Sequence, residues 1–128
     1  MEIKDFCTGL QHIGIPTIDI EQSIAFYNRL GFELIMRTQN GDEKVAFLQM
    51  HNVVIETYEN HAATLQAGAI DHIAIDVKNI EALFEIIKTE GFELVDEGIN
   101  SLPFWERGIK YFIILGPNRE KIEFCERL

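Results

Sequence analysis

The sequence has no long hydrophobic run and contains few cysteines, prolines and tryptophans. Its 128 residues include two cysteines, three prolines and one tryptophan, and its 11 Lys and Arg are outnumbered by 21 Asp and Glu. No stretch approaches the ~18 uninterrupted apolar residues of a membrane span. The N-terminal segment MEIKDFCTGL lacks the apolar core of a secretory signal. These features predict a cytoplasmic protein that does not enter a membrane.

The shortage of positive charge also limits the expected partners. A formal net charge of −10 at pH 7 comes without the clustered Lys and Arg that bind a phosphate backbone, which argues against nucleic acid. In a chain that is not exported we expect Cys7 and Cys125 to be free thiols. The content of 47% hydrophobic and 25% charged residues is typical of a globular domain. A small molecule is the expected partner.

The sequence does contain an internal repeat. The stretch HIGIPTIDIEQSIAFYNRLGFELI (12–35) returns without a gap as HIAIDVKNIEALFEIIKTEGFELV (72–95), at an offset of 60 residues and with nine of 24 positions identical. An I-E-x-x-E sequence follows in each copy, at 55–59 and 122–126, so the second copy carries seven extra residues. We predict one domain, residues 1–128, made of two similar modules, 8–60 and 69–127, that a linker at 61–68 joins.

Each copy has the pattern of a strand, a helix and three further strands. Asp19 is the expected N-cap of the first helix and Gly31 its end, and Asn79 and Gly91 are their counterparts in the second copy. This β-α-β-β-β order predicts the α+β class. Strands are expected at 10–15, 32–38, 44–50 and 53–58, and at 70–77, 92–95, 109–115 and 121–125.

Four residues with metal-binding side chains occupy corresponding positions in the two copies: His12, Glu56, His72 and Glu123. Each is next to an isoleucine in a predicted strand, so helices packed on the isoleucine face would leave imidazoles and carboxylates on the other. Unpaired carboxylates in a cavity are costly, and a divalent metal removes that cost. Imidazole with carboxylate oxygen suits Ni, Co, Fe, Mn or Zn. A lone His is usually structural, but four matching positions favour one divalent metal site.

These motifs resemble the vicinal-oxygen-chelate superfamily, and within it glyoxalase I (lactoylglutathione lyase). The segments H-I-G-I, F-Y, L-G-F-E-L, V-I-E, D-H-I-A-I and G-P-N-R-E-K-I-E-F carry the resemblance over nearly the whole chain. It implies the glyoxalase/bleomycin-resistance-like fold, in which two βαβββ modules form a cupped, partly open mixed β-sheet, and a homodimer that covers exposed sheet edges. It also implies that His12, Glu56, His72 and Glu123 bind the metal, with Glu123 as main catalytic base and Glu56 as second.

The resemblance implies a metal-dependent lyase or isomerase that converts a 2-oxoaldehyde thiohemiacetal to a 2-hydroxyacyl thioester through an enediolate. In bacterial glyoxalase I, an Arg shortly after the first His contacts glutathione. This sequence has Pro16 at that place, so the resemblance does not determine which thiol is used. An enzyme resembling methylmalonyl-CoA epimerase is a second possibility, although that family commonly has Gln where Glu56 stands. The same fold also accommodates a superfamily oxygenase and a non-catalytic drug-binding protein.

The seven extra residues of the second copy fall within 96–108. The segment Leu102 to Arg107 in that range carries Phe104 and Trp105, where no core periodicity requires aromatic residues. We predict that this segment forms a lid over the substrate, and a protein interface is the alternative. Arg107 and Arg37, with Lys110, are the expected cationic contacts for an acidic group of the substrate.

Overall fold

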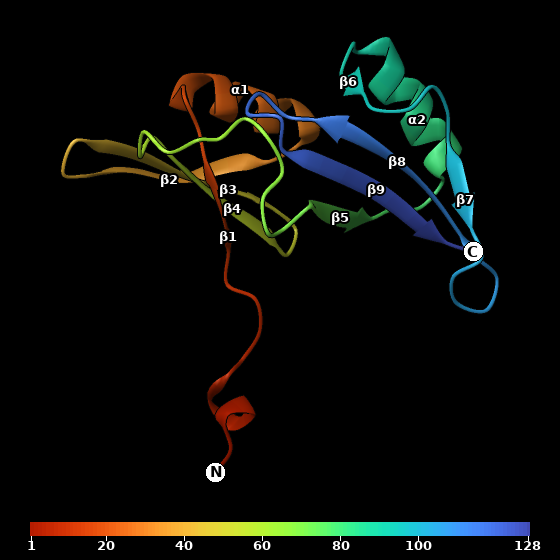
Figure 1. Ribbon diagram of the computed structural model, residues 1–128, viewed down its shortest axis with the longest axis horizontal. Coiled ribbons are helices and arrows are strands. Elements are labelled where there is room, and N and C mark those ends of the chain that lie inside the picture. The colour runs from red at the N-terminus through yellow and green to blue at the C-terminus, as the bar shows by residue number, and fades with distance from the viewer. The chain divides into compact units, whose positions relative to one another are not determined.

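The structure is a computed structural model that describes residues 1–128 and divides into two compact units, Met1–Ala63 and Thr64–Leu128. Each unit has the predicted order of a strand, a helix and further strands, and each builds a sheet of its own (Figure 1). The α+β class and the two βαβββ modules are thereby confirmed, while the grouping of both modules into one domain stays a prediction. None of the helices has the length and apolar character that crossing a membrane requires.

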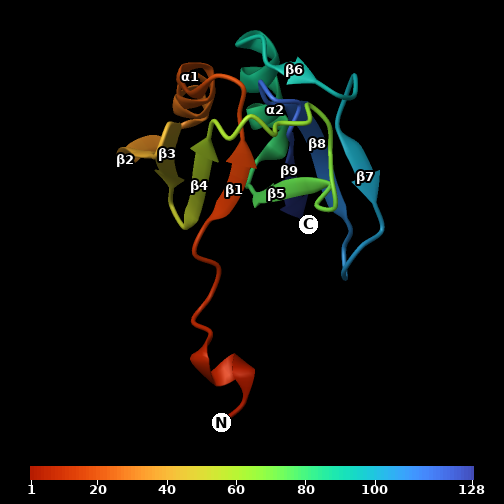
Figure 2. The ribbon, with the colours of Figure 1, turned by 60° about the vertical axis from the view of Figure 1, so that its left-hand side comes forward.

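The first unit holds one four-stranded sheet and one α-helix. Its elements are η1 (Ile3–Phe6, a 3-10 helix), β1 (Ile13–Pro16), α1 (Ile20–Leu30), β2 (Glu33–Asn40), β3 (Glu43–Met50) and β4 (Val53–Tyr58). The strand order is β1-β4-β3-β2, with β1 parallel to β4 and the other pairs antiparallel. Figures 1 and 2 show α1 along one face of this sheet and the chain before β1 extending away from it. β1 begins later than predicted, so His12 lies just before it.

Local sequence sets the limits of α1 as predicted. Asp19 accepts hydrogen bonds from the backbone N–H groups of Glu21 and Gln22 at 3.0 and 3.3 Å. Gly31 ends the helix with φ of 105°, a left-handed conformation that glycine adopts at little cost. The apolar side of the helix packs toward β3 and β4 and is buried at Ile20, Ile24 and Tyr27.

The second unit repeats this arrangement with one additional strand. Its elements are β5 (His72–Asp76), α2 (Ile80–Thr89), β6 (Glu93–Leu94), β7 (Asn100–Leu102), β8 (Ile109–Leu115) and β9 (Lys121–Arg127). The strand order is β5-β9-β8-β6, with β5 parallel to β9. β7 was not predicted: it lies in the loop that carries the seven extra residues and pairs antiparallel with β8. Part of the predicted loop is therefore tied to the sheet.

The start of α2 is capped by a different residue from the predicted one. Asn79 occupies the N-cap position, but with φ of 52° and without a side-chain hydrogen bond to the helix. Instead, Oε1 of Glu126 on β9 accepts the N–H of Ile80 at 2.9 Å. Glu59 has the same role in the first unit, where its Oε2 accepts the N–H of Ile20 at 2.7 Å. The last glutamate of each I-E-x-x-E sequence thus joins the last strand to the start of the helix.

Candidate metal and substrate site

Each unit contains one histidine–glutamate pair, and the two pairs have the same geometry. Nε2 of His12 lies 3.4 Å from Oε1 of Glu56, and Nε2 of His72 lies 3.6 Å from Oε1 of Glu123. The register explains the match, because each glutamate lies opposite the residue two positions after the histidine of its unit. Side chains two residues apart project from the same face of a sheet. The predicted pairing of imidazole and carboxylate on one face therefore exists within each unit.

The opposite face of each sheet is the one that the helix covers. Ile55 and Ile122, which precede the two glutamates, are buried with exposed fractions of 2% and 1%. The side chains of Glu56 and Glu123 point the other way and keep 27% and 14% of their surface exposed. Apolar burial thus fixes which face of the sheet presents the carboxylates.

The second ring nitrogen of each histidine also has a partner. Nδ1 of His12 lies 2.9 Å from Oε1 of Gln11, and Nδ1 of His72 lies 2.9 Å from Oδ2 of Asp71. Because these oxygens accept hydrogen bonds, the hydrogen belongs on Nδ1, and a neutral ring presents the Nε2 lone pair to the glutamate. In each pair, the Nε2 lone pair of the histidine then faces a carboxylate oxygen of the glutamate. A cation bound by both atoms would remove the repulsion between these two electron-pair donors. Such a donor set, with its outer hydrogen bonds, fits a divalent metal.

The two histidines differ in the charge of their outer partner. Asp71 also accepts a hydrogen bond from Nζ of Lys121 at 3.2 Å. The hydrogen bond with His72, and to a smaller extent the one with Lys121, holds the pKa of Asp71 below its usual value, so the Asp71 side chain remains a carboxylate. Gln11 offers His12 an uncharged amide instead. Sequence reasoning missed Asp71, although its place directly before a repeated histidine was the available signal.

Cys125 lies on the same face of β9 as Glu123. Burial is the main cause that raises the pKa of the Cys125 thiol. The pKa is raised further by the negative charges of Glu123 and Asp76 and by the hydrogen bond with Glu123. Cys125 therefore stays protonated and acts as a hydrogen-bond donor rather than as a thiolate ligand. Both Cys7 and Cys125 are free, as predicted.

Neither unit assembles a metal site by itself. No group of three or more His, Cys, Asp or Glu side chains is placed to hold a metal ion. Each unit supplies two donors in the pair described above. The predicted four-ligand site requires both pairs, and it stays a prediction.

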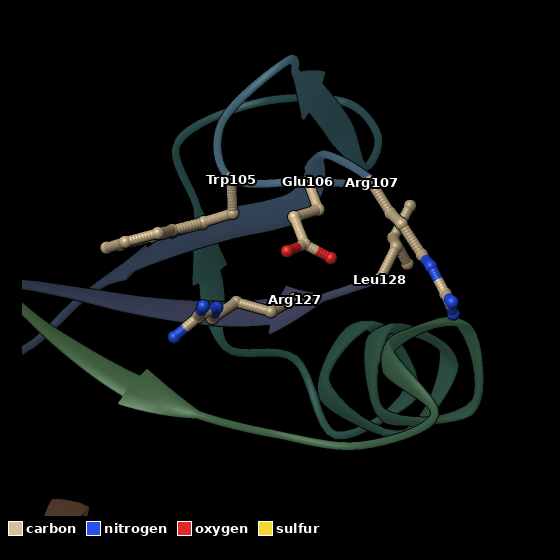
Figure 3. Close-up of a pocket in the computed structure, with 5 residues that line it drawn as sticks. All are labelled: Trp105, Glu106, Arg107, Arg127 and Leu128. Carbon is tan, nitrogen blue, oxygen red and sulfur yellow. The ribbon is translucent and has the colours of Figure 1, made fainter.

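The segment before β8 places its tryptophan against an arginine that the sequence did not single out. Trp105 has φ of 61° and is 69% exposed, and Cζ of Arg127 lies 4.1 Å from the centroid of its ring. Figure 3 shows the Arg127 side chain extending toward the indole, whereas Arg107 points the other way. Phe104 is 51% exposed and does not line this pocket. Arg127 is thus the cation beside Trp105. The predicted substrate contact of Arg107 and the lid role of the segment stay predictions.

The two other predicted cationic contacts are paired with helices. Arg37 on β2 forms a salt bridge with Glu21 of α1, which raises the pKa of Arg37 and lowers that of Glu21. Nζ of Lys110 on β8 lies 2.6 Å from Oε1 of Glu81 on α2. Both cations are paired with a carboxylate in this structure, and their predicted contact with a substrate stays a prediction.

Comparison with known proteins identifies the family. The model of the Glyoxalase/Bleomycin resistance protein/Dioxygenase superfamily matches residues 9–124. The chain belongs to this superfamily. One relative, the uncharacterized protein YwbC of Bacillus subtilis (strain 168), is 35% identical over 125 residues, which cover 92% of this chain and 97% of the relative.

Solved structures show the same superfamily fold. The glyoxalase family protein from Enterococcus faecalis is similar with a TM-score of 0.79 and 20% identity, over 94% of this chain and 99% of that one. The fosfomycin resistance protein FosX from Listeria monocytogenes has a TM-score of 0.76 and 20% identity, over 96% of each chain. TnmS3, an antibiotic binding protein from Streptomyces sp. CB03234, has a TM-score of 0.76 and 14% identity, over 96% of this chain and 98% of that one.

Proposed function

We propose that this superfamily member is a metal-dependent lyase or isomerase of the glyoxalase I type. It would convert a 2-oxoaldehyde thiohemiacetal to a 2-hydroxyacyl thioester through an enediolate, in the cytoplasm. The observation that supports this most is the pair of matched histidine–glutamate contacts, at 3.4 and 3.6 Å, each with Nδ1 of the ring held by a neighbouring oxygen. Two imidazole–carboxylate pairs at corresponding positions of the repeat supply the mixed nitrogen and oxygen ligands that such a divalent metal prefers.

The proposed ligands of one divalent metal (Ni, Co, Zn, Fe or Mn) are His12, Glu56, His72 and Glu123. When bound, the metal would supply Lewis acidity to two adjacent oxygens of the substrate. The chain's own contribution is orientation, because the hydrogen bonds at Nδ1 fix the plane of each imidazole and direct its Nε2 lone pair.

Glu123 is the proposed catalytic base. Its carboxylate takes the proton from the C–H carbon of the thiohemiacetal, and the electron pair of that bond forms the enediolate. The same carboxyl group returns the proton to the neighbouring carbon, while the hydroxyl proton of the thiohemiacetal passes to the former carbonyl oxygen, so the isomerisation consumes no proton. The side chain of Glu123 is 14% exposed against 27% for Glu56, so bulk water has less access to a proton held there. Glu56 is the proposed second base.

Metal content and turnover, measured on the same preparation, test this function. We expect about one Ni, Co, Zn, Fe or Mn per proposed site, and thioester formation from methylglyoxal with at least one of several low-molecular-weight thiols. His12→Ala and His72→Ala should each remove the metal. His51→Ala is the control, because His51 is an exposed turn residue without a carboxylate partner. A protein that takes up none of these metals would overturn the proposal.

Small-molecule binding without catalysis is the second candidate. It is favoured by the pocket of about 410 Å³ that Trp105, Glu106, Arg107, Arg127 and Leu128 line, because this pocket needs no metal to bind a small molecule. The structurally similar FosX and TnmS3 are described as a fosfomycin resistance protein and an antibiotic binding protein. In this case the metal analysis would be negative, while a panel of antibiotics would raise the melting temperature of the metal-free protein.

A further inference from the structure

We propose that Arg127, stacked on Trp105, is the centre of a subsite for the carboxylate or phosphate end of an elongated substrate, with Arg107 as a second cation on the other side of the same pocket. The subsite lies about 13 Å along β9 from Glu123, at ~3.3 Å per residue. The chemistry of the substrate's other end, the end that reacts at Glu123, rests on the proposed function. Anion binding at the subsite does not depend on that function and requires no metal. The proposal narrows the substrate to an organic anion long enough to reach from one position to the other.

Arg127 and Glu123 lie on the same face of β9. They are four residues apart in a regular strand, and every second side chain of a strand projects from the same side. The residues between them support this assignment, because Ile122 and Phe124 are buried on the helix side. A molecule lying along this face could therefore reach the proposed base and the arginine together.

Both arginines of the subsite have free hydrogen-bonding capacity. No salt bridge or hydrogen bond engages Arg107 or Arg127, while Arg37, Lys110 and Lys121 each pair with a carboxylate. Two unpaired guanidinium groups at one pocket are unexpected in a chain of net charge −10. A guanidinium presents a planar fork of N–H donors that matches a carboxylate or a phosphate.

The surrounding chain holds the subsite in place. Stacking on the indole of Trp105 restricts the Arg127 side chain and leaves the edges of its guanidinium open to a ligand. The carbonyl of Gly108 accepts the N–H of Leu128 at 3.0 Å, which ties the segment to the end of β9. Gly108 has φ of 85°, and a Cβ there would lie 3.0 Å from the carbonyl oxygen of Leu102, so this close turn requires glycine. The resulting pocket has a volume of about 410 Å³.

Glu106 is the opposing charge in the same pocket. Figure 3 shows its carboxylate between the head groups of Arg127 and Arg107. It forms no salt bridge with either arginine, so it weakens the positive potential without neutralising a particular guanidinium. Removal of this charge should strengthen anion binding, whereas removal of an arginine should weaken it.

Trp105 is the only tryptophan of the chain and lies at the subsite, so its fluorescence can report binding. The full chain, freed of metal and then of chelator by desalting, would be titrated with pyrophosphate, inorganic phosphate and succinate, with KCl at matched ionic strength as reference. We expect a saturable change for the three anions that KCl does not reproduce. Isothermal calorimetry with pyrophosphate gives a readout that does not depend on the indole.

Variants assign the effect to the proposed residues. Arg127→Gln should raise the half-saturating pyrophosphate concentration about tenfold, the value of one charge-assisted contact. Glu106→Gln should lower it severalfold. Lys88→Gln on α2 removes the same charge from an exposed site of the same unit and should change it less than twofold.

Three results would overturn the subsite. One is a fluorescence change that follows ionic strength alone, and another is equal affinity of Arg127→Gln and Lys88→Gln by calorimetry. The third is an indole signal that varies with protein concentration and not with anion, which would make Trp105 part of a contact between copies. The titrations use metal-free protein, so their result does not depend on whether the proposed catalysis is correct. In the same way, the metal analysis does not depend on whether the subsite binds anions.

Discussion

Nδ1 of His72 lies 2.9 Å from a carboxylate oxygen of Asp71, whereas the same atom of His12 meets the neutral amide of Gln11 at the same distance. A negative partner raises the donor strength of the imidazole, so His72 should be the stronger ligand of the proposed metal. Asp71→Asn should weaken Ni or Zn binding by ~10-fold or more, the usual effect of losing such a partner. Gln11→Glu should strengthen it.

Competition with a metallochromic chelator measures both effects. If Asp71→Asn and Gln11→Glu leave the affinity within twofold of the parent chain, the outer hydrogen bonds do not influence metal binding. Circular dichroism of each variant checks that the fold is retained.

Glu123→Gln should keep the metal and lose turnover. The amide oxygen of the glutamine can still coordinate, but it cannot accept a proton, and a positioned base contributes ~10²–10⁴-fold. The measurement is the thioester-forming rate at full metal occupancy. Activity within a few-fold of the parent would transfer the role of base to Glu56, for which Glu56→Gln is the matched variant.

Cys125 should react slowly with iodoacetamide at pH 8. Its raised pKa keeps the thiolate fraction low and shifts the whole alkylation profile to higher pH. Exposed Cys7 serves as the internal reference in peptide mass spectrometry. Glu123→Gln removes one of the negative charges that raise this pKa, so it should move the Cys125 profile back toward lower pH. An unshifted profile in that variant would contradict the contact between the two side chains.

Glu59→Ala and Glu126→Ala should each lower the free energy of unfolding by about 1 kcal/mol. Each removes the carboxylate that accepts the first helical N–H, and loss of an N-terminal cap costs about 0.5–2 kcal/mol. Urea denaturation followed by circular dichroism gives the values. Glu85→Ala on the exposed side of α2 is the control and should cost less than ~0.5 kcal/mol.

The edge strand β2 supports the predicted homodimer. All eight of its residues are exposed, and it presents Leu34, Ile35 and Met36 at an unpaired sheet edge. We expect sedimentation velocity to show a dimer at micromolar concentration and Ile35→Lys to dissociate it. Ile86→Lys, at an exposed position of α2, is the control. A monomer in the parent chain would exclude the dimer.

The parts of the fold that depend on local pattern could be predicted from the sequence. Asp19 and Gly31 act within one turn of α1, so their residue types sufficed to place its two ends. The histidine–glutamate pairs were predictable for a similar reason, because strand alternation and the repeat register together fix which face each side chain occupies.

The parts that depend on distant segments could not be predicted in this way. The capping of α2 by Glu126 joins residues 46 apart, and nothing around Asn79 distinguishes it from a capping residue. The stacking of Arg127 on Trp105 depends on a positive φ at Trp105 and on where β9 ends. Neither quantity follows from periodicity.

The long-range helix caps also bear on how the chain folds as it leaves the ribosome. The first N–H of α1 and of α2 finds its acceptor only 39 and 46 residues further along the sequence. Neither helix gains this capping contact before the last strand of its own module has emerged. Since Glu59 lies within Met1–Ala63, the first module contains its own closing contact and can fold while the second is still being translated.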